Sequence, residues 1–272
     1  MASPASSAFG SALRSWRQRG GRTQMELALQ SNTSARHLSF LESGRAQPSR
    51  AMILRLAAAL DMPLRDRNRL LLTGGFAPVF GERPLADDQL EHARKALNLI
   101  LEKHDPYPAL VVNRRWDILM ANKGAQMLLG WLAPAGVANH DSPLNAFRLL
   151  LDPAALRPYV QNWAECMPSL VLRMRRELGD LGQAEGADKL LKELLAFPGV
   201  QEAAVESDLV AKLDPLLPVT YVKDGLRLSW FTTVTTFGTP QDATLQDLRI
   251  EGFFPADATT ENRLSALCVP RY

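Results

Sequence analysis

The chain has 272 residues, which is enough for two ordinary domains that each bury a core. Its net charge of +2 is unevenly spread: residues 1–72 hold eleven arginines, no lysine and four acidic residues, so they carry +7 and the remaining 200 residues carry −5. Unless these arginines are simple surface residues, the first part is expected to meet a polyanion, and the acidic remainder is excluded from that role.

Residues 1–73 predict a first domain that is mainly α-helical and holds five short helices. Apolar residues at helical spacing indicate the first helix, which Gly20-Gly21 ends. Thr23 is expected to cap the second helix, and Glu26 three residues later completes a capping box. The start of the second helix is therefore the best-marked boundary of this domain.

The third helix, residues 34–44, presents two different faces. Leu38 and Leu41 lie one turn apart and are expected to face inward. Across a sector of about 140° on the opposite side lie Ala35, Arg36, Ser39 and Phe40. A fourth helix begins at Ser49, and a fifth covers residues 64–74.

Residues 74–89 are the predicted linker, because glycines and prolines gather there without a regular apolar period. The second domain covers residues 90–272 and begins with an amphipathic helix that ends at about residue 104. Two apolar runs, 109–112 and 116–120, then flank an Asn-Arg-Arg turn, which predicts a β-hairpin.

Helices and then strands complete the second domain. A helix covers residues 123–132, and residues 154–197 are helical apart from a glycine-rich loop. Asp224-Gly225 predicts a tight hairpin between two β-rich runs, and residues 245–255 supply a fifth strand. The second domain is therefore predicted to be α+β, with two strands, a helical insertion and three more strands.

The second domain carries no recognisable catalytic motif. Its histidines lie far from any nucleophile at a catalytic spacing, and it has no phosphate-binding glycine loop, metalloprotease motif or pair of catalytic carboxylates. Cys166 and Cys268, the two cysteines of the chain, lie outside any metal-ligand spacing. We therefore expect neither an enzyme nor a metal site.

No stretch of the sequence predicts a membrane segment. No apolar run approaches the roughly 18 to 20 residues that cross a bilayer. The first ten residues lack the basic start and apolar middle of a signal peptide. We expect a cytoplasmic protein that does not bind a membrane.

The first domain resembles the helix-turn-helix domain of the phage-repressor and xenobiotic-response-element family over about residues 8–72. The resemblance rests on the order of "TQMELA", a four-residue turn, "SARHLSFLESG" and "PS". In that family the third helix enters the major groove of DNA. Arg36 is then the best candidate to bond O6 and N7 of guanine. Phe40 would lie against a thymine methyl or pack under the fourth helix, and Ala35 and Ser39 complete the base-reading face.

The same resemblance implies phosphate contacts. Gln24 stands where family members place a glutamine that meets a phosphate and braces the recognition helix. His37 either bonds to the backbone or contacts a phosphate. Arg17 and Glu42 occupy the places of a buried ion pair. The further phosphate contacts are expected from Arg22, Thr23, Ser43 and Arg45. One such domain buries too little surface for tight binding, so a homodimer on a palindromic operator is expected.

The second domain resembles the MmyB-like ligand-binding domain. The resemblance rests on "YPALVVNRRWDILMAN", "LLLDP" and "FGTPQDATLQDLRIEGFFPAD", and it runs from "LLLTGGFAP" to near the C-terminus. It implies a PAS-like domain, with a five-stranded antiparallel sheet, helices over one face and a pocket for a hydrophobic small molecule such as a fatty acid. The chain departs from the family around residues 198–208, where typical members carry a tryptophan.

Large apolar side chains are the candidates for that pocket, although most such residues form core in any domain. By their place in the hairpin, Trp116, Met120 and Asn122 are expected near the ligand, with a helix cap as the alternative for Asn122. The other candidates are Trp131, Phe147, Trp163, Met167, Met174 and Phe231. Arg173 and Arg175 would pair with a carboxylate head group or lie solvated on the surface.

These patterns predict a bacterial transcriptional regulator, by default a repressor, whose second domain binds an apolar or amphipathic metabolite without any other cofactor. The ligand would alter the spacing of two DNA-reading domains by preferring one arrangement of the dimer. Two alternatives remain. The second domain is a dimerisation or partner module without ligand, or it holds haem or flavin, with His104 and Cys166 as axial ligands.

Overall fold

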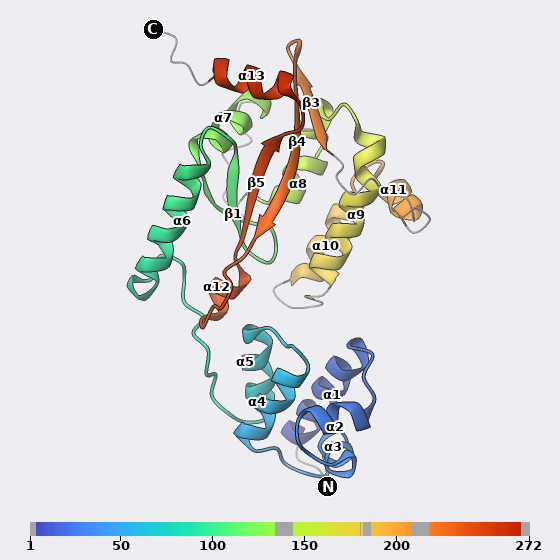
Figure 1. The fold of residues 1–272 in the computed structure, drawn as a ribbon. Coiled ribbons are helices and arrows are strands. Elements are labelled where there is room, and N and C mark those ends of the chain that lie inside the picture. Colours follow the sequence, from blue (N-terminus) through green and yellow to red (C-terminus); the bar gives the residue numbers. More distant parts are fainter. Residues whose placement is uncertain (1–3, 134–143, 180, 182–185, 208–217, 268–272) are drawn as a thin grey trace. The chain divides into compact units, whose positions relative to one another are not determined.

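The computed structural model describes residues 4–133, 144–179, 181, 186–207 and 218–267. The chain divides into two compact units, of which the first contains residues 1–90 and 237–246 and the second contains residues 91–236 and 247–272. Each unit is described by itself below, with the element labels of Figure 1.

The N-terminal unit contains the five predicted helices. They are α1 (Pro4–Arg19), α2 (Gln24–Gln30), α3 (Ala35–Glu42), α4 (Arg50–Ala59) and α5 (Leu64–Thr73). Thr23 and Glu26 form the predicted capping box, and Ser34 and Ser49 cap α3 and α4. The apolar core includes Phe9, Leu13, Leu27, Leu38, Leu41, Ile53, Leu56 and Leu71. Leu38 and Leu41 thus anchor α3 and leave its other face outside the core.

Gly10 of α1 allows a close approach to the end of α3. A Cβ atom at this position would lie 2.5 Å from the carbonyl oxygen of Glu42 and 2.7 Å from that of Leu41. Both atoms belong to the backbone, so neither can turn away as a flexible side chain would.

Gly10→Ala should therefore lower the free energy of unfolding of this unit by about 1–3 kcal/mol, the usual cost of overpacking. This should occur although alanine favours helix more than glycine. Gly20→Ala is the matched control, because a Cβ atom there meets its nearest neighbours at 3.6 Å. Amide hydrogen exchange in α1 and α3 measures both variants. Equal stability of the two would contradict the steric explanation.

The segment after α5 is bound to that helix by Asn68. The Oδ1 atom of Asn68 accepts hydrogen bonds from the backbone N–H groups of Val79 and Phe80, at 3.0 and 3.1 Å, and Nδ2 donates to the Phe80 carbonyl at 2.8 Å. Arg65 and Glu82 add an ion pair of 2.7 Å. The structure differs here from the predicted linker, 74–89, because α5 supplies partners for its backbone.

Residues 237–246 also belong to the N-terminal unit, although they connect two strands of the sheet in the other unit. The backbone N–H of Ala243 donates to the Gly81 carbonyl at 2.8 Å, and Arg83 forms an ion pair of 3.1 Å with Asp242. The backbone N–H of Leu64 donates to Gln246 Oε1 at 2.5 Å. The predicted division at residues 73 and 90 misses this segment, because the contacts that hold it lie about 160–180 residues away in the sequence.

The second unit is built around the predicted five-stranded antiparallel sheet, in the order β2-β1-β5-β4-β3. The strands are β1 (Ala109–Val112), β2 (Ile118–Ala121), β3 (Val219–Lys223), β4 (Leu226–Thr235) and β5 (Arg249–Pro255). Asp224 and Gly225 form the tight turn between β3 and β4 with positive φ angles of 50° and 74°, as that hairpin type requires. β5, the last strand in sequence, therefore lies in the middle of the sheet.

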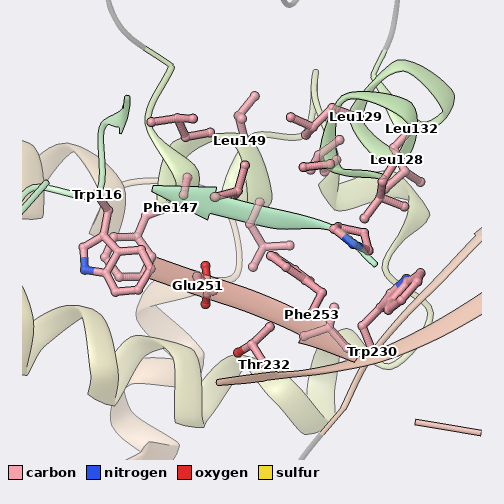
Figure 2. A pocket seen from close by; sticks show the side chains of 18 of the residues that line it. Trp116, Leu128, Leu129, Leu132, Phe147, Leu149, Trp230, Thr232, Glu251 and Phe253 are labelled. Carbon is pink, nitrogen blue, oxygen red and sulfur yellow. The ribbon is translucent and has the colours of Figure 1, made fainter. Parts of the chain in front are cut away.

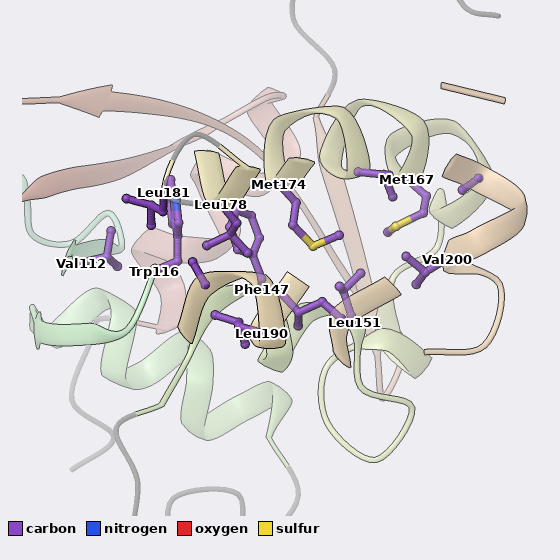
Figure 3. Packing of buried hydrophobic residues seen from close by; sticks show 14 of the residues in the cluster. Val112, Trp116, Phe147, Leu151, Met167, Met174, Leu178, Leu181, Leu190 and Val200 are labelled. Carbon is purple, nitrogen blue, oxygen red and sulfur yellow. The ribbon is translucent and has the colours of Figure 1, made fainter. Parts of the chain in front are cut away.

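The second unit also contains helices, and the sequence patterns predicted some of them. The α-helices of this unit are α6 (Glu91–His104), α7 (Lys123–Leu132), α8 (Ala146–Leu151), α9 (Trp163–Gly179), α10 (Ala187–Leu195), α11 (Val200–Ser207) and α13 (Ala258–Leu267), with a short 3₁₀ helix at Arg157–Tyr159. The short helix α12 (Ala243–Asp247), except its last residue, and the 3₁₀ helix Asp88–Leu90 belong to the N-terminal unit. The long helix expected from residue 154 begins only at Trp163, and α8, α11, α12 and α13 were not predicted. Figure 3 shows the apolar core in which Met167, Met174 and Leu178 of α9 pack with residues of α8 and α10.

Candidate functional site

The outward face of α3 carries the predicted base-reading residues. Arg36 is exposed, whereas Ala35, Ser39 and Phe40 are half-buried. The guanidinium carbon of Arg36 lies 5.5 Å from the centre of the Phe40 ring, within the range of a cation–π contact. Ala35 also packs against the core, while Phe40 does not belong to the described core cluster. Arg36 is thus the most available polar group on this face, and Phe40 gives it a platform.

Glu42 joins α3 to α1 and α2. Its two carboxylate oxygens accept hydrogen bonds from Arg17 at 2.6 and 3.0 Å, and Oε2 accepts another from Gln24 Nε2 at 2.8 Å. Burial alone would raise the pKa of the Glu42 carboxyl, but these hydrogen bonds and the Arg17 charge hold the pKa below its ordinary value. The position of α3 therefore depends on an ionised and nearly buried carboxylate.

The predicted phosphate-binding residues differ in how far their side chains are already hydrogen-bonded within the protein. Arg22 hydrogen-bonds to Gln30 and lies 3.8 Å from Asp61. The Thr23 hydroxyl donates to Glu26 at 2.8 Å, and the Ser43 hydroxyl donates to the Phe40 carbonyl at 3.3 Å. Gln24 uses one amide hydrogen on Glu42, as its expected bracing role requires, whereas the side chain of Arg45 is exposed. His37 is half-buried.

The second unit encloses an elongated apolar cavity between the sheet and α7, α8 and α9. The empty space within it and at its mouth amounts to about 860 Å³. Figure 2 shows Trp116 and Phe147 at one end and Leu128, Leu129 and Leu132 of α7 toward the other. The residues around it are Pro108, Leu110, Trp116, Ile118, Ala125, Leu128, Leu129, Leu132, Ala146, Phe147, Leu149, Leu150, Leu156, Leu170, Arg173, Val219, Tyr221, Trp230, Thr232, Glu251 and Phe253.

One end of this cavity is polar. Arg173 Nη1 of α9 lies 3.0 Å from Glu251 Oε1 of β5, and the guanidinium carbon lies 4.1 Å from the centre of the Trp116 ring. Burial raises the pKa of the Glu251 carboxyl above its ordinary value, although the charge of Arg173 and hydrogen bonds from Arg173 and Thr232 oppose the rise. The charged pair is thus set into an otherwise hydrophobic wall.

Of the nine predicted pocket residues, the structure brings two, Trp116 and Phe147, to the cavity. Their rings contact each other at a centroid distance of 5.0 Å. Trp116 lies in the turn before β2 with a φ angle of 66°, and not in the strand where the apolar run had suggested.

Asn122 is the N-cap of α7, which was the alternative interpretation of this residue. Its side chain accepts hydrogen bonds from the backbone N–H groups of Ala109 and Ala125 and donates to the carbonyls of Leu101 and Tyr107. These bonds occupy the amide group, which joins α6, β1 and α7 and does not line the cavity.

The remaining predicted pocket residues also lie away from the cavity. Phe231 alternates along β4 with the cavity residues Trp230 and Thr232, so it lies on the other face of the sheet, stacked on Phe254 at 5.4 Å. Met167 and Met174 are in the core, because α9 turns them toward α8, α10 and α11. Met120, Trp131 and Trp163 are partly buried against other residues and do not line the cavity either.

Sequence reasoning missed Glu251, Thr232 and the leucines of α7. A glutamate between Ile250 and Gly252 in an apolar strand is a signal that could have identified the first of these. Arg173 does line the cavity, but its carboxylate partner comes from the protein itself, and Arg175 lies outside the cavity.

The residues proposed as axial ligands do not meet in the cavity. A ring nitrogen of His104 lies 3.2 Å from the Phe253 carbonyl, and burial raises the pKa of the Cys166 thiol to about 11. No cluster of three His, Cys, Asp or Glu side chains suited to a metal ion occurs among the described residues. Within the same part of the chain, no helix is long and apolar enough to cross a membrane.

Comparison with known proteins assigns both units. Residues 93–267 match the MmyB-like transcription regulator ligand binding domain, and residues 8–70 match a helix-turn-helix domain. A comparison with curated proteins gives no match.

Two solved structures are similar to part of the chain. The clp gene regulator ClgR from Corynebacterium glutamicum is 34% identical over 27% of this chain and 91% of its own, with a TM-score of 0.24. The restriction-modification controller protein C.AhdI from Aeromonas hydrophila is 34% identical over 23% of this chain and 94% of its own, with a TM-score of 0.22. The family match to the second unit covers well over half of the chain. This chain therefore belongs to the MmyB-like transcription regulators and is a helix-turn-helix DNA-binding protein with a ligand-binding domain, not an enzyme.

Proposed function

We propose that this regulator represses transcription as a homodimer on a palindromic operator and responds to an amphipathic small molecule held in the C-terminal cavity. The observation that carries the proposal is the elongated, mainly apolar cavity, with the Arg173–Glu251 pair at one end, in the ligand-binding domain of a DNA-binding chain. A dimer bound across a promoter blocks polymerase without further contacts, which favours repression over activation.

On the DNA side, we assign base reading to α3. Arg36 would bond guanine, and Phe40 would support the guanidinium while its ring edge meets a thymine methyl. Ala35 and Ser39 would complete the contact with the base edges. The expected phosphate contacts are those of Arg22, Thr23, Gln24, Ser43 and Arg45, which position α3 without reading sequence.

On the ligand side, the long apolar wall fits an alkyl chain, as in fatty acids and their derivatives, within a PAS-like domain. β4 and β5 both line the cavity, and residues 237–246 that connect them are bound to α5 and the segment after it. A ligand that shifts either strand would therefore act on a segment held by the N-terminal unit. It can change DNA binding only if it binds one arrangement of the dimer more tightly than another.

The test is selection of bound duplexes from a random DNA pool, with and without lipid extract, combined with mass spectrometry of the native and denatured protein. We expect a palindromic consensus, a dimer mass, and an added small-molecule mass that disappears on denaturation. A consensus obtained without any bound molecule or response to extract would instead favour a dimerisation or partner module. A coloured protein would favour haem or flavin.

A further inference from the structure

We infer that the cavity selects an uncharged head group that both donates and accepts hydrogen bonds, such as a hydroxyl or a primary amide, over a carboxylate. The inference rests on the proposed ligand-binding function and specifies the class of ligand. It depends on how the charges at the polar end of the cavity are already arranged.

The positive charge of Arg173 already has a partner in the protein. Its Nη1 atom donates to Glu251 Oε1 at 3.0 Å, and the side chains of the pair are only 24% and 8% exposed. With Glu251 ionised in this pair, the two charges cancel, so the polar end is neutral before a ligand enters. A ligand carboxylate would add an uncompensated negative charge beside the largely buried carboxylate of Glu251, which is unfavourable.

The same two residues leave hydrogen-bonding capacity of both kinds. Arg173 Nη2 is buried and has no hydrogen-bond partner among the described residues. Its N–H groups can therefore donate to an acceptor atom of a ligand. Glu251 as a carboxylate accepts several hydrogen bonds, so it can take one from a ligand donor. Figure 2 shows Glu251 beside Thr232 on the floor of the cavity, with the leucines of α7 toward the other end. With its hydroxyl or amide bound at Glu251, a ligand would extend its alkyl chain toward those leucines.

Direct binding of three alkyl probes that differ only in the head group tests this inference. We expect decanol and decanamide to bind the full-length protein at neutral pH about tenfold or more tightly than decanoate, a difference of about 1.4 kcal/mol. Glu251→Gln keeps the shape of the side chain and frees the charge of Arg173. It should reverse the order and make decanoate the tightest of the three. Glu193→Gln is the matched control, because Glu193 forms an exposed ion pair with Arg148 and should leave the order unchanged.

The possible results separate this inference from the proposed function. If decanoate binds the native protein as tightly as decanol, the inference is overturned while the ligand-binding function stands. If none of the three probes binds, both the inference and the alkyl-ligand part of the proposed function fail. The comparison on the native protein decides the matter even if Glu251→Gln does not fold. The double variant Arg173→Met with Glu251→Gln, which has no charge at this end, should lose the discrimination.

Discussion

Glu42→Ala should lower the free energy of unfolding of the N-terminal unit by about 3–5 kcal/mol, the cost of removing one partner from a buried ion pair. Arg17 would keep its charge in a nearly buried position without the acceptor that now lies at 2.6 Å, and Gln24 would lose its hydrogen bond as well. The loss should appear as faster amide hydrogen exchange in α1 and α3 of the full-length chain, because exchange reports the stability of each unit separately.

Two control variants distinguish a lost ion pair from a lost side chain. Glu193→Ala removes the carboxylate from an exposed pair with Arg148, whose side chains are 38% and 45% exposed, and should cost at most about 1 kcal/mol. The double variant Arg17→Met with Glu42→Leu should recover most of the stability, since a buried pair replaced by apolar residues is often neutral. A loss for Glu42→Ala no larger than that for Glu193→Ala would contradict the bracing role.

The features that could be predicted from sequence depend on neighbouring residues. Thr23 and Glu26 specify the start of α2, Asn122 the start of α7, and Asp224-Gly225 the turn of a hairpin. In each case the signal and the structure that it predicts lie within about four residues of each other. The pairing of Arg17 with Glu42 is long-range, and it was accessible because the resemblance to phage repressors supplied it.

The cavity was harder to predict because it depends on strand register and on which face of a helix turns inward. Choosing large side chains selected Phe231, but its neighbours Trp230 and Thr232 are the residues that line the cavity. Successive residues of a strand point to opposite faces, so an error of one position moves a side chain out of the site. Likewise α9 directs Met174 into the core and Arg173 toward the cavity.

The division into two units could not be predicted from composition alone. Residues 74–89 look like a flexible linker because they are rich in glycine and proline, yet Asn68 binds the backbone of this segment. In the sequence, most of the second domain lies between α5 and the segment 237–246, although the two are in contact. Such contacts depend on the complete fold and leave no local pattern. The segment itself is covalently continuous with the cavity-lining strands β4 and β5, so these contacts connect those strands to the DNA-binding unit.

Arg36→Ala should weaken binding to the preferred operator by about 2–6 kcal/mol, because the proposed dimer would lose one guanine contact of about 1–3 kcal/mol in each half-site. Binding to random duplex should change little, since non-specific affinity comes from phosphate contacts. The expectation rests on the exposure of Arg36 and on the Phe40 ring, which lies 5.5 Å from its guanidinium carbon and restricts its orientation. Anisotropy titrations of both duplexes at several salt concentrations measure the effect.

Arg45→Ala is the matched control, because it removes an equally charged and exposed side chain that is expected to contact phosphate. It should weaken operator and random duplex alike and reduce the salt dependence by about one phosphate contact per subunit. Phe40→Ala should reproduce part of the specificity loss of Arg36→Ala, because the guanidinium would lose its platform. If Arg36→Ala instead weakened both duplexes equally, Arg36 would be a phosphate contact, and base reading would have to come from Ser39 and Phe40.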